Sequence, residues 1–423
     1  MARTLTPVDA HAIMNALVKQ ATGQQAITAV DTSTFVSAGE LVLSTGVENT
    51  LNALSLIIGR TFMAVRPYEA KLKIVDSLNT GAYTDRLRKI SVYSKDAQAA
   101  GDWNTNLYTN LYDGVGDIKY NSGGIENVGS QWEINKPVVL EQNFAGSSVW
   151  DDSLTVFEYQ LKKAFRDESE FNAFVSGIMV QKENDIEMQK EAWNRMTLLN
   201  QMAGRIALEG TLINGGAVNL TTAFNNRFGT AYTSAQLRSV YLTDFLSFLV
   251  STIKQYSRKL ELPTINHHYT PTITRDGVQY STLLRHTPKS KQKLVMYEPL
   301  FIDSTAQVLP EIFNPQYLDI GNYEGVMYWQ AEGVGIDNAG INVTPAIPDG
   351  SGSQTASSDP VEIPFVVGML FDEDSTMTNF QLDSAYSTQV NARHSYRNLW
   401  WHYMRGSLCD YSENAVVFYM ADE

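Results

Sequence analysis

A single cysteine, Cys409, occurs among the 423 residues of the chain. One thiol excludes an intrachain disulfide, and such sparing use of cysteine is typical of a reducing compartment. A lone cysteine beside Asp410 and Tyr411 is more often an inert packing residue than a nucleophile. We therefore predict no redox or thiol chemistry at this position.

Long apolar runs are also missing. No stretch approaches the roughly 18 apolar residues of a membrane-spanning helix, and the longest, such as Phe365 to Leu370, have the length of a strand. The first residues, Met1 to Val8, lack the basic start and apolar centre of a secretory signal. The sequence therefore predicts a soluble cytoplasmic product.

Charge is scarce and mostly negative. Charged residues make up 18% of the chain, against about 25% in average proteins. Lys and Arg number 32 while Asp and Glu number 46, which gives a net charge of −14 at pH 7. Such a surface repels polyanions, so the composition disfavours a protein that reads a nucleic-acid sequence. Few charges together with 11% aromatic residues suggest extensive contact with partners, although a well-packed globular enzyme fits the same numbers.

Motifs of catalysis and metal binding are absent from the sequence. Of six histidines only His267 and His268 are adjacent, and neighbouring residues point to different sides of a strand or helix. No HExxH, CxxC, Walker loop or GxSxG occurs. The carboxylates Asp372 and Asp374 start a pattern like a calcium loop, but Met377 stands where that loop needs glycine. We predict no catalytic residue, no metal site and no cofactor, while 46 acidic residues leave a hydrolytic carboxylate pair open as an alternative.

The length predicts two or three substructures, because single cores stop growing near about 250–300 residues. A first helix is expected from Pro7, with Thr6 as its cap and Gly23 at its end. A second is expected from Thr45 to Gly59. The Thr/Ser/Gly-rich stretch between the two has little reason to pack.

Two strands with an irregular segment between them are expected next. Residues 86–93 and 132–140 alternate in the manner of strands, and the residues between them are rich in Gly, Asn, Asp and Tyr. Because a compact domain rarely tolerates so long an irregular connection, this region predicts an extended β arm. Such an arm must bury one face on something else.

Helices dominate the middle of the chain. Residues 154–166 and 234–260 are expected to be helical, and Ile178 to Ala203, which lacks Gly and Pro, predicts a rod of about 39 Å. Its apolar stripe comprises Ile186, Trp193, Met196, Ala203 and Ile206. Glu183, Glu187 and Glu191 form a row on another face, where like charges repel modestly.

The last part of the chain reads as strands and turns. Strands are expected at residues 293–296, 325–329, 363–370 and 415–420, with an exposed low-complexity loop at 339–360. Tyr396, Trp400, Trp401 and Tyr403 form an aromatic cluster, with Arg393, Arg397 and Arg405 nearby. Packing is a better interpretation of this cluster than base stacking, because the chain is acidic. The whole pattern predicts the α+β class.

Three segments resemble the major capsid proteins of tailed bacteriophages, the Hong Kong 97-like family. The first is Trp132 to Asp152 (WEINKPVVLEQNFAGSSVWDD), followed by LKKAFRDESEFNAFVSGIMVQKENDIEMQKEAWNRM. The second is His286 to Asp303 (HTPKSKQKLVMYEPLFID), and the third is Val390 to Met420 (VNARHSYRNLWWHYMRGSLCDYSENAVVFYM). Their order, with an arm before a rod helix, carries the resemblance.

The resemblance implies a division of the chain into five parts. An N-terminal arm would span residues 1–70 and an extended β-hairpin arm, the E-loop, 71–150. A peripheral domain with the long spine helix would span 151–233, an axial domain 234–370, and the last peripheral strands 371–423. Only about 70 residues precede the hairpin arm, which is too few for the large scaffolding domain of some members, so a separate scaffolding protein is expected.

The resemblance also implies a function. Such a chain would assemble with itself into hexamers and pentamers of an icosahedral shell around double-stranded DNA, with a scaffolding protein and a portal as partners. Its place would be the virion, and the host cytoplasm during assembly. It would act as a structural protein and not as an enzyme.

The residues themselves suggest one contact between subunits. The arm strand carries Arg86, Arg88 and Lys89, and the rod helix carries Glu183, Glu187 and Glu191. We predict that these two rows meet across a subunit boundary and set register and assembly rate. The alternative is that both rows are solvated and contribute less than about 1 kcal/mol per pair.

Three other functions remain open from the sequence. An encapsulin-type compartment shares the expected fold but holds cargo proteins instead of a genome. A phage tail or decoration protein would form tubes or trimers. An acidic hydrolase would act on polysaccharide or ester substrates.

Overall fold

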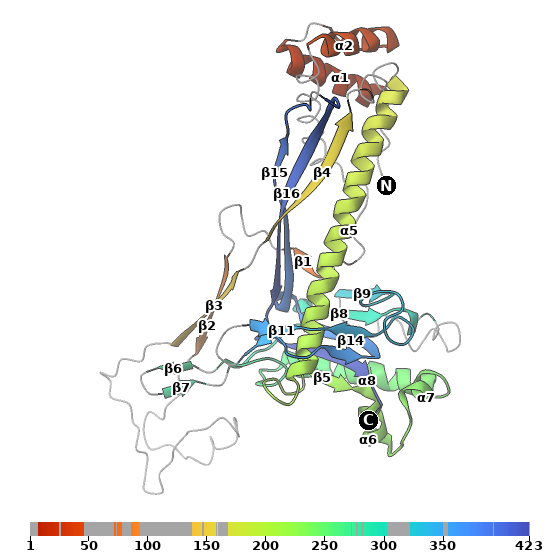
Figure 1. Cartoon of the computed structure of the whole chain (residues 1–423). Helices are drawn as coiled ribbons and strands as arrows, with labels where there is room; N and C mark the ends of the chain where they lie inside the picture. The colour runs from red at the N-terminus through yellow and green to blue at the C-terminus, as the bar shows by residue number, and fades with distance from the viewer. Residues whose placement is uncertain are drawn as a thin grey trace. The chain divides into compact units, whose positions relative to one another are not determined.

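A computed structural model of the chain is shown in Figure 1. It describes residues 7–24, 27–45, 72, 74–77, 86–93, 138–145, 148–157, 159, 168–271, 273–275, 278–280, 283–300, 302, 322–349, 354–391 and 393–422. The chain divides into two compact units. Unit 1 comprises Met1–Asp85, Gly146–Leu198 and Met377–Leu408, and unit 2 comprises Arg86–Ala145, Leu199–Thr376 and Cys409–Glu423. The five-part division expected from the resemblance stays a prediction.

Unit 1 begins with two helices that pack on each other, α1 (Pro7–Thr22) and α2 (Thr32–Ser44). The predicted first helix is confirmed, and Gly23 follows it in the left-handed region with φ of 74°. Helix α2 lies where we expected no packing, so that prediction is wrong. The carboxylate of Asp31 caps α2 by accepting from the Thr34 amide at 2.8 Å, and a buried apolar face compensates for the Ser and Thr content. The helix predicted at 45–59 lies outside the described residues.

A four-stranded sheet forms the second layer of unit 1. Its order is β1 (Asp76–Ser77), β15 (Thr376–Ser387), β16 (Tyr396–Cys409) and β4 (Ser148–Phe157). Strand β4 corrects the helix predicted from residue 154, because Asp152, Leu154 and Val156 alternate inward with period two. In β16, Trp401 and Tyr403 are buried, which confirms packing as the role of the aromatic cluster.

Helix α5 (Glu168–Leu208) is the rod predicted from the sequence, and at 41 residues it is longer than expected. Of its predicted stripe, Ile186 and Ala203 are buried, whereas Met196 is 48% exposed, so the stripe was wrong at that position. Lys182, on the same helix, donates to Asp152 of β4 at 2.7 Å. Ile186 joins the core of unit 1 with residues of α1, α2, β4 and β16.

The centre of unit 2 is a five-stranded sheet. Its order is β5 (Ala217–Asn219), β17 (Ala415–Met420), β14 (Phe365–Asp372), β8 (Gln292–Tyr297) and β9 (Asn322–Val326). Strands β8, β14 and β17 confirm three predicted strands, and β9 lies a few residues before the predicted 325–329. Strands β8 and β14 are buried along their whole length, as expected for central strands.

Three helices belong to the same unit: α6 (Leu220–Phe228), α7 (Ser234–Arg238) and α8 (Leu242–Glu261). The single helix predicted over 234–260 is therefore two helices. The break is at Ser239, whose φ of −121° and ψ of −79° leave the helical region. Tyr241, just before α8, stacks on Tyr232 at 4.0 Å between ring centroids, and this contact stabilises the break.

Short strands complete the unit. They are β6 (Ile273–Arg275), β7 (Val278–Tyr280), β10 (Ile341–Val343), β11 (Ala346–Pro348), β12 (Gln354–Ala356) and β13 (Val361–Ile363), with 3-10 turns η2 (Lys289–Lys291) and η3 (Glu373–Ser375). Strands β10, β11 and β12 lie within the predicted 339–360 loop, and Ala339 and Ile341 are buried, so this segment is more ordered than expected.

The strand predicted at residues 86–93 is confirmed, and of the strand predicted at 132–140 the described residues 138–140 are strand. Strands β2 (Arg86–Tyr93) and β3 (Val138–Ala145) pair antiparallel along their full length, from Arg86 opposite Ala145 to Tyr93 opposite Val138. The intervening residues 94–137 lie outside the described part. With helices and with sheets that contain both antiparallel and parallel strand pairs, the predicted α+β class is confirmed.

Candidate functional site

The hairpin β2–β3 has two different faces. Directly opposed residues of antiparallel strands share a face. Ile90, Val92 and Val139 are 54%, 54% and 46% exposed, and Val92 lies opposite Val139. The other face carries Lys89, half-buried, and Ser91, which is buried. The outward face thus carries these exposed apolar side chains beside the exposed Glu141 and Asn143. On the inward face the polar Lys89 and Ser91 lie beside the half-buried Leu140 and Phe144.

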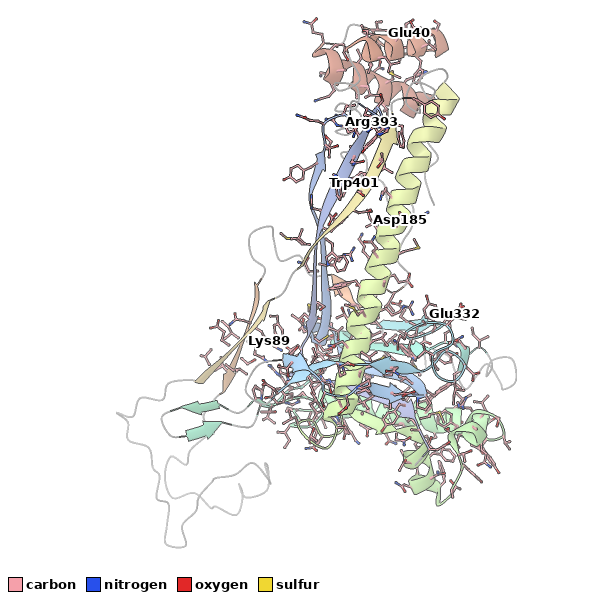
Figure 2. All side chains as sticks on the ribbon, viewed as in Figure 1. Glu40, Lys89, Asp185, Glu332, Arg393 and Trp401 are labelled. Atoms are coloured by element: carbon pink, nitrogen blue, oxygen red, sulfur yellow. The ribbon has the colours of Figure 1, made fainter. Side chains whose placement is uncertain are left out.

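The inward face is held by a turn near the C-terminus. Figure 2 shows Lys89 on the hairpin. The Lys89 ammonium donates to the carboxylates of Asp410 and Glu413, and its Nζ lies 3.3 Å from the Ser412 hydroxyl. Gln142 of β3 accepts from the same hydroxyl at 3.2 Å. Both strands of the hairpin are therefore bonded to residues 410–413.

Arg285 supplies a second cation at this place. Its Nη2 donates to the Ser91 hydroxyl at 2.7 Å and lies 3.6 Å from the Glu413 carboxylate. Its Nε donates to the Ser412 carbonyl at 3.3 Å. Lys89, Arg285, Asp410 and Glu413, named here the root cluster, thus bring two positive and two negative groups together.

Arg205 of α5 holds the backbone of the turn formed by residues 410–413. This guanidinium is fully buried and donates to the backbone carbonyls of His267 at 2.6 Å and Glu413 at 2.5 Å. Weaker bonds reach Asp410 at 3.4 Å and Ala415 at 3.5 Å. Because an arginine presents a rigid fork of donors, these contacts fix the backbone that carries both carboxylates.

Burial affects the ionisable groups of this region. It raises the pKa of Glu413, although the nearby Lys89 and Arg285 act in the opposite direction. It also raises the pKa of the Cys409 thiol to about 12. The interpretation of Cys409 as a packing residue is consistent with this environment, because a protonated buried thiol is a poor nucleophile.

The predicted contact residues are placed as follows. Lys89 has its acidic partners, Asp410 and Glu413, within the same chain. On α5, Glu187 accepts from Lys190 at 2.7 Å and Glu191 from Arg195 at 2.8 Å, as helical neighbours do. The side chains of Arg86, Arg88 and Glu183 lie outside the described part of the structure. A contact between subunits therefore stays a prediction.

Sequence reasoning missed Arg285, Asp410 and Glu413. The two carboxylates lie 321 and 324 residues from Lys89, and no periodicity connects segments so far apart. The acidic pair flanking Ser412 was visible in the sequence, but nothing there paired it with a basic strand.

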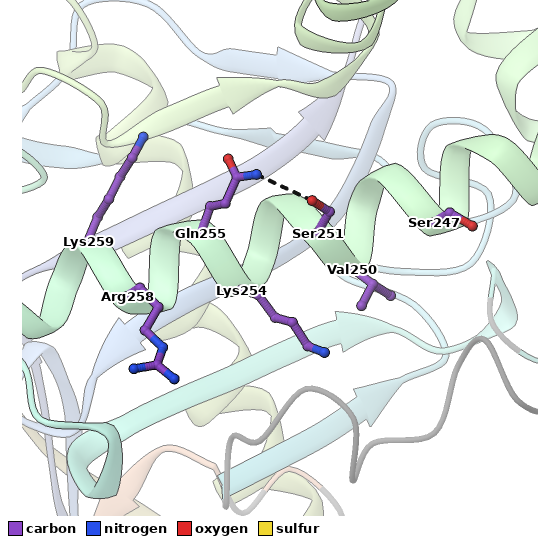
Figure 3. A pocket seen from close by; sticks show the side chains of 7 residues that line it. All are labelled: Ser247, Val250, Ser251, Lys254, Gln255, Arg258 and Lys259. Atoms are coloured by element: carbon purple, nitrogen blue, oxygen red, sulfur yellow. Dashed lines mark hydrogen bonds between the residues drawn. The ribbon is translucent and has the colours of Figure 1, made fainter.

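The molecule also has a shallow hollow on α8 (Figure 3), with a volume of about 640 Å³. Its lining consists of Ser247, Val250, Ser251, Lys254, Gln255, Arg258 and Lys259. The described lining contains no carboxylate, histidine or thiol, so it does not bring together an acid and a base for catalysis. Nowhere in the described residues do three His, Cys, Asp or Glu side chains gather as metal ligands would. Of the described helices, none has the length and apolarity to cross a bilayer.

Comparison with known sequences gives the family. The sequence model of the Phi29-like phage major capsid protein family matches residues 137–419, which is more than half of the chain. The matched region includes β3, α5 and the turn that holds the hairpin. The chain therefore belongs to the Phi29-like phage major capsid proteins. Its function is that of a structural protein of a bacteriophage capsid, which is built from many copies and forms part of the virion.

Solved phage capsids resemble the chain loosely. A chain from the capsid of Staphylococcus phage Andhra has a TM-score of 0.47 and 9% identity, covering 84% of each chain. A chain from the mature capsid of bacteriophage PhiM1 has a TM-score of 0.41 and 9% identity, covering 84% of this chain and 88% of that one. No curated protein sequence matches significantly. Family membership rests on the sequence match, which confirms the predicted phage capsid protein over the compartment shell, tail protein and hydrolase alternatives.

Proposed function

We propose that copies of this chain assemble as hexamers and pentamers into an icosahedral shell that encloses double-stranded DNA. Each copy would have the Hong Kong 97-like arrangement, with an N-terminal arm (1–70), hairpin arm (71–150), spine-helix domain (151–233), axial domain (234–370) and terminal strands (371–423). A separate scaffolding protein and a portal would take part, and assembly would occur in the host cytoplasm. Membership in the capsid protein family supports this proposal.

The outward face of the hairpin is the single observation that favours association between copies. A two-stranded hairpin is marginally stable by itself, and here its inward face is already bonded to its own chain. Ile90, Val92 and Val139 remain exposed on the other face, beside the exposed Glu141 and Asn143. Apolar groups gathered on one surface mark interaction sites, and a second copy is the partner that a many-copy capsid supplies. Repeated heterologous contacts of this kind close rings.

Negative-stain electron microscopy tests this function. The protein is expressed alone and with its scaffolding partner, and closed particles or rings are the expected result. Val92→Asp should abolish particles, because burying an unpaired carboxylate at an interface is costly. Val92→Thr, which has nearly the same shape, should retain them. A monodisperse monomer in every condition, or full assembly of Val92→Asp, would contradict the proposal.

We further propose that Arg86, Arg88 and Lys89 of one copy meet Glu183, Glu187 and Glu191 of another. Lys89 already has acidic partners in its own chain, so Arg88 gives the sharper test. Arg88→Glu should lower the assembly rate and weaken its salt dependence, which light scattering can follow. Wild-type yield with unchanged salt dependence would leave the two rows as solvated surfaces.

A further inference from the structure

The root cluster connects segments that lie far apart in the sequence. Lys89 comes from β2, Arg285 from the segment before η2, and Asp410 and Glu413 from the turn between β16 and β17. The exposed fractions of the four side chains are low: 22% for Lys89, 20% for Arg285, 2% for Asp410 and 11% for Glu413. Solvent therefore screens these charges little.

Buried ion pairs are costly to form and costly to break. Each charge must lose water, and the partners recover that cost only in good geometry. Removing one partner leaves another charge buried and unpaired, which is strongly unfavourable. The four groups here balance, with two positive and two negative charges in direct contact. A hairpin placed differently on its own chain would break that balance.

We infer that the root cluster is a positioning device: it holds the hairpin against residues 410–413 in one register and one orientation, so that Ile90, Val92 and Val139 face outward. The inference rests on the proposed function only in that the outward face is then the one offered to a second copy.

The alternation of β2 makes this device selective. Lys89 and Ser91 alternate with Ile90 and Val92, so a shift by one residue would exchange the two sets. A shift in one direction would place Ile90 against the carboxylates of Asp410 and Glu413, and a shift in the other direction would place Arg88 there. With Ile90 in that place, two anions would be buried without the Lys89 ammonium. The cluster thus disfavours the register that turns Ile90 inward.

Part of the acidic side of the cluster is fixed by bonds that do not involve the hairpin. Arg205 holds the backbone of the turn through the carbonyl of Glu413. Asp410 accepts from the Ser412 amide at 2.8 Å and from its hydroxyl at 2.7 Å. These bonds lie within the turn and α5, so they do not depend on β2. The Asp410 carboxylate is therefore held by its own turn, ready to accept from the Lys89 ammonium.

Amide hydrogen exchange of unassembled subunits tests the inference. Lys89→Met keeps the length of the side chain and removes its charge. We expect residues 86–93 and 138–145 to exchange at least tenfold faster in this variant, while β14 exchanges at the wild-type rate. Ile90→Met, on the outward face of the same strand, is the matched control and should match the wild type. Equal protection of the hairpin in Lys89→Met and wild type would overturn the inference.

A double-mutant cycle with Glu413→Gln adds a second measurement. Glu413→Gln combined with Lys89→Met removes one charge of each sign, so that Arg285 and Asp410 are the charges of the cluster that remain. If the four groups act together, the double variant exchanges more slowly in the hairpin than the product of the two single effects predicts. Strictly multiplicative effects would show that Lys89 and Glu413 act independently and would also overturn the inference.

Particle formation is measured separately. Exchange in the free subunit reports on the root cluster, and electron microscopy reports on assembly. Absence of particles for the wild type would contradict the proposed function and leave the exchange result standing. If Lys89→Met forms normal particles and its hairpin exchanges amide hydrogens at the wild-type rate, the positioning role is contradicted and the proposed function is not.

Discussion

Gly204 of α5 lies directly against the phenol of Tyr411. A Cβ at residue 204 would overlap the Tyr411 hydroxyl and its nearest ring carbons. That hydroxyl is fixed by the carbonyls of Asn200, at 3.0 Å, and Ala346, at 2.9 Å. Tyr411 is buried and its ring cannot give way without breaking these bonds. Glycine is thus the residue that lets α5 approach the turn that carries Asp410 and Glu413.

Gly204→Ala should therefore destabilise unit 2. Overpacking of a well-packed site costs about 1–3 kcal/mol, and this overlap falls at the upper end of that range or beyond. Chemical denaturation measures the free energy of unfolding. Gly177→Ala in the same helix is the control, because nothing lies within 4 Å of its Cβ, and it should gain about 0.5–1 kcal/mol. Similar effects of the two substitutions would contradict the packing argument.

Arg205→Met should be among the most damaging single substitutions in the described part of the chain. The methionine side chain fits the space, but the carbonyls of His267 and Glu413 lose a charged donor. Hydrogen bonds to charged groups contribute about 1.5–3 kcal/mol each, so a loss of at least 3 kcal/mol is expected. Arg205→Lys should retain more stability than Arg205→Met but less than the wild type, because one ammonium cannot reproduce the fork of donors of a guanidinium. Thermal unfolding followed by circular dichroism gives the comparison, and a wild-type midpoint for Arg205→Met would refute the role assigned to the guanidinium.

His268 makes stability depend on pH. Its Nε2 lies 2.7 Å from the Leu283 carbonyl, and its Nδ1 lies 3.1 Å from the side-chain oxygen of Asn414. Burial, with a smaller contribution from the charge of Arg205, lowers the pKa of His268 to about 4. An unfolded histidine takes up its proton near pH 6.5, so between about pH 6.5 and 4 the unfolded chain binds more protons than the folded one. The contribution of His268 to stability is thus full above pH 6.5 and is lost as the pH falls, by roughly 3 kcal/mol in total.

The measurement is the free energy of unfolding of wild type and His268→Gln at pH 8 and pH 5. The wild type should lose more stability than the variant between these two values. His286→Gln, at an exposed histidine, is the control and should behave as the wild type does. Equal losses in wild type and His268→Gln would show that residue 268 does not contribute to the pH dependence.

Local patterns in the sequence predicted the elements that have strong local signals. Helix α1 was marked by Pro7 and Gly23, and α5 by a long stretch without proline. Strand β2 was predicted with its observed bounds, Arg86–Tyr93, because its side chains alternate. The fold class followed from such elements, and the family followed from the resemblance of three segments, in their order, to the Hong Kong 97-like capsid proteins.

The failures occurred where tertiary contacts outweigh local preference. Helix α2 is rich in Ser and Thr, and its stability comes from Phe35, Ala38 and Val42 in the core of unit 1. Residues 154–157 were predicted as a helix, yet Val156 faces that same core from a strand. Only one side of the root cluster could be predicted from the sequence, for a related reason. The strand carrying Lys89 was recognised, but its partners come from a turn more than 300 residues away, and no local pattern connects them.

The sole cysteine of the chain closes β16, and its burial has a practical consequence. With a pKa of about 12, only roughly one thiol in ten thousand is ionised at pH 8 while the strand end stays in place. Exposure would return the thiol to its ordinary reactivity. The rate at which a thiol reagent modifies Cys409 in the native protein therefore measures how often this strand end opens. Because the chain has one cysteine, the measurement needs no engineered label and reports on a single position, the residue next to the turn that holds the hairpin.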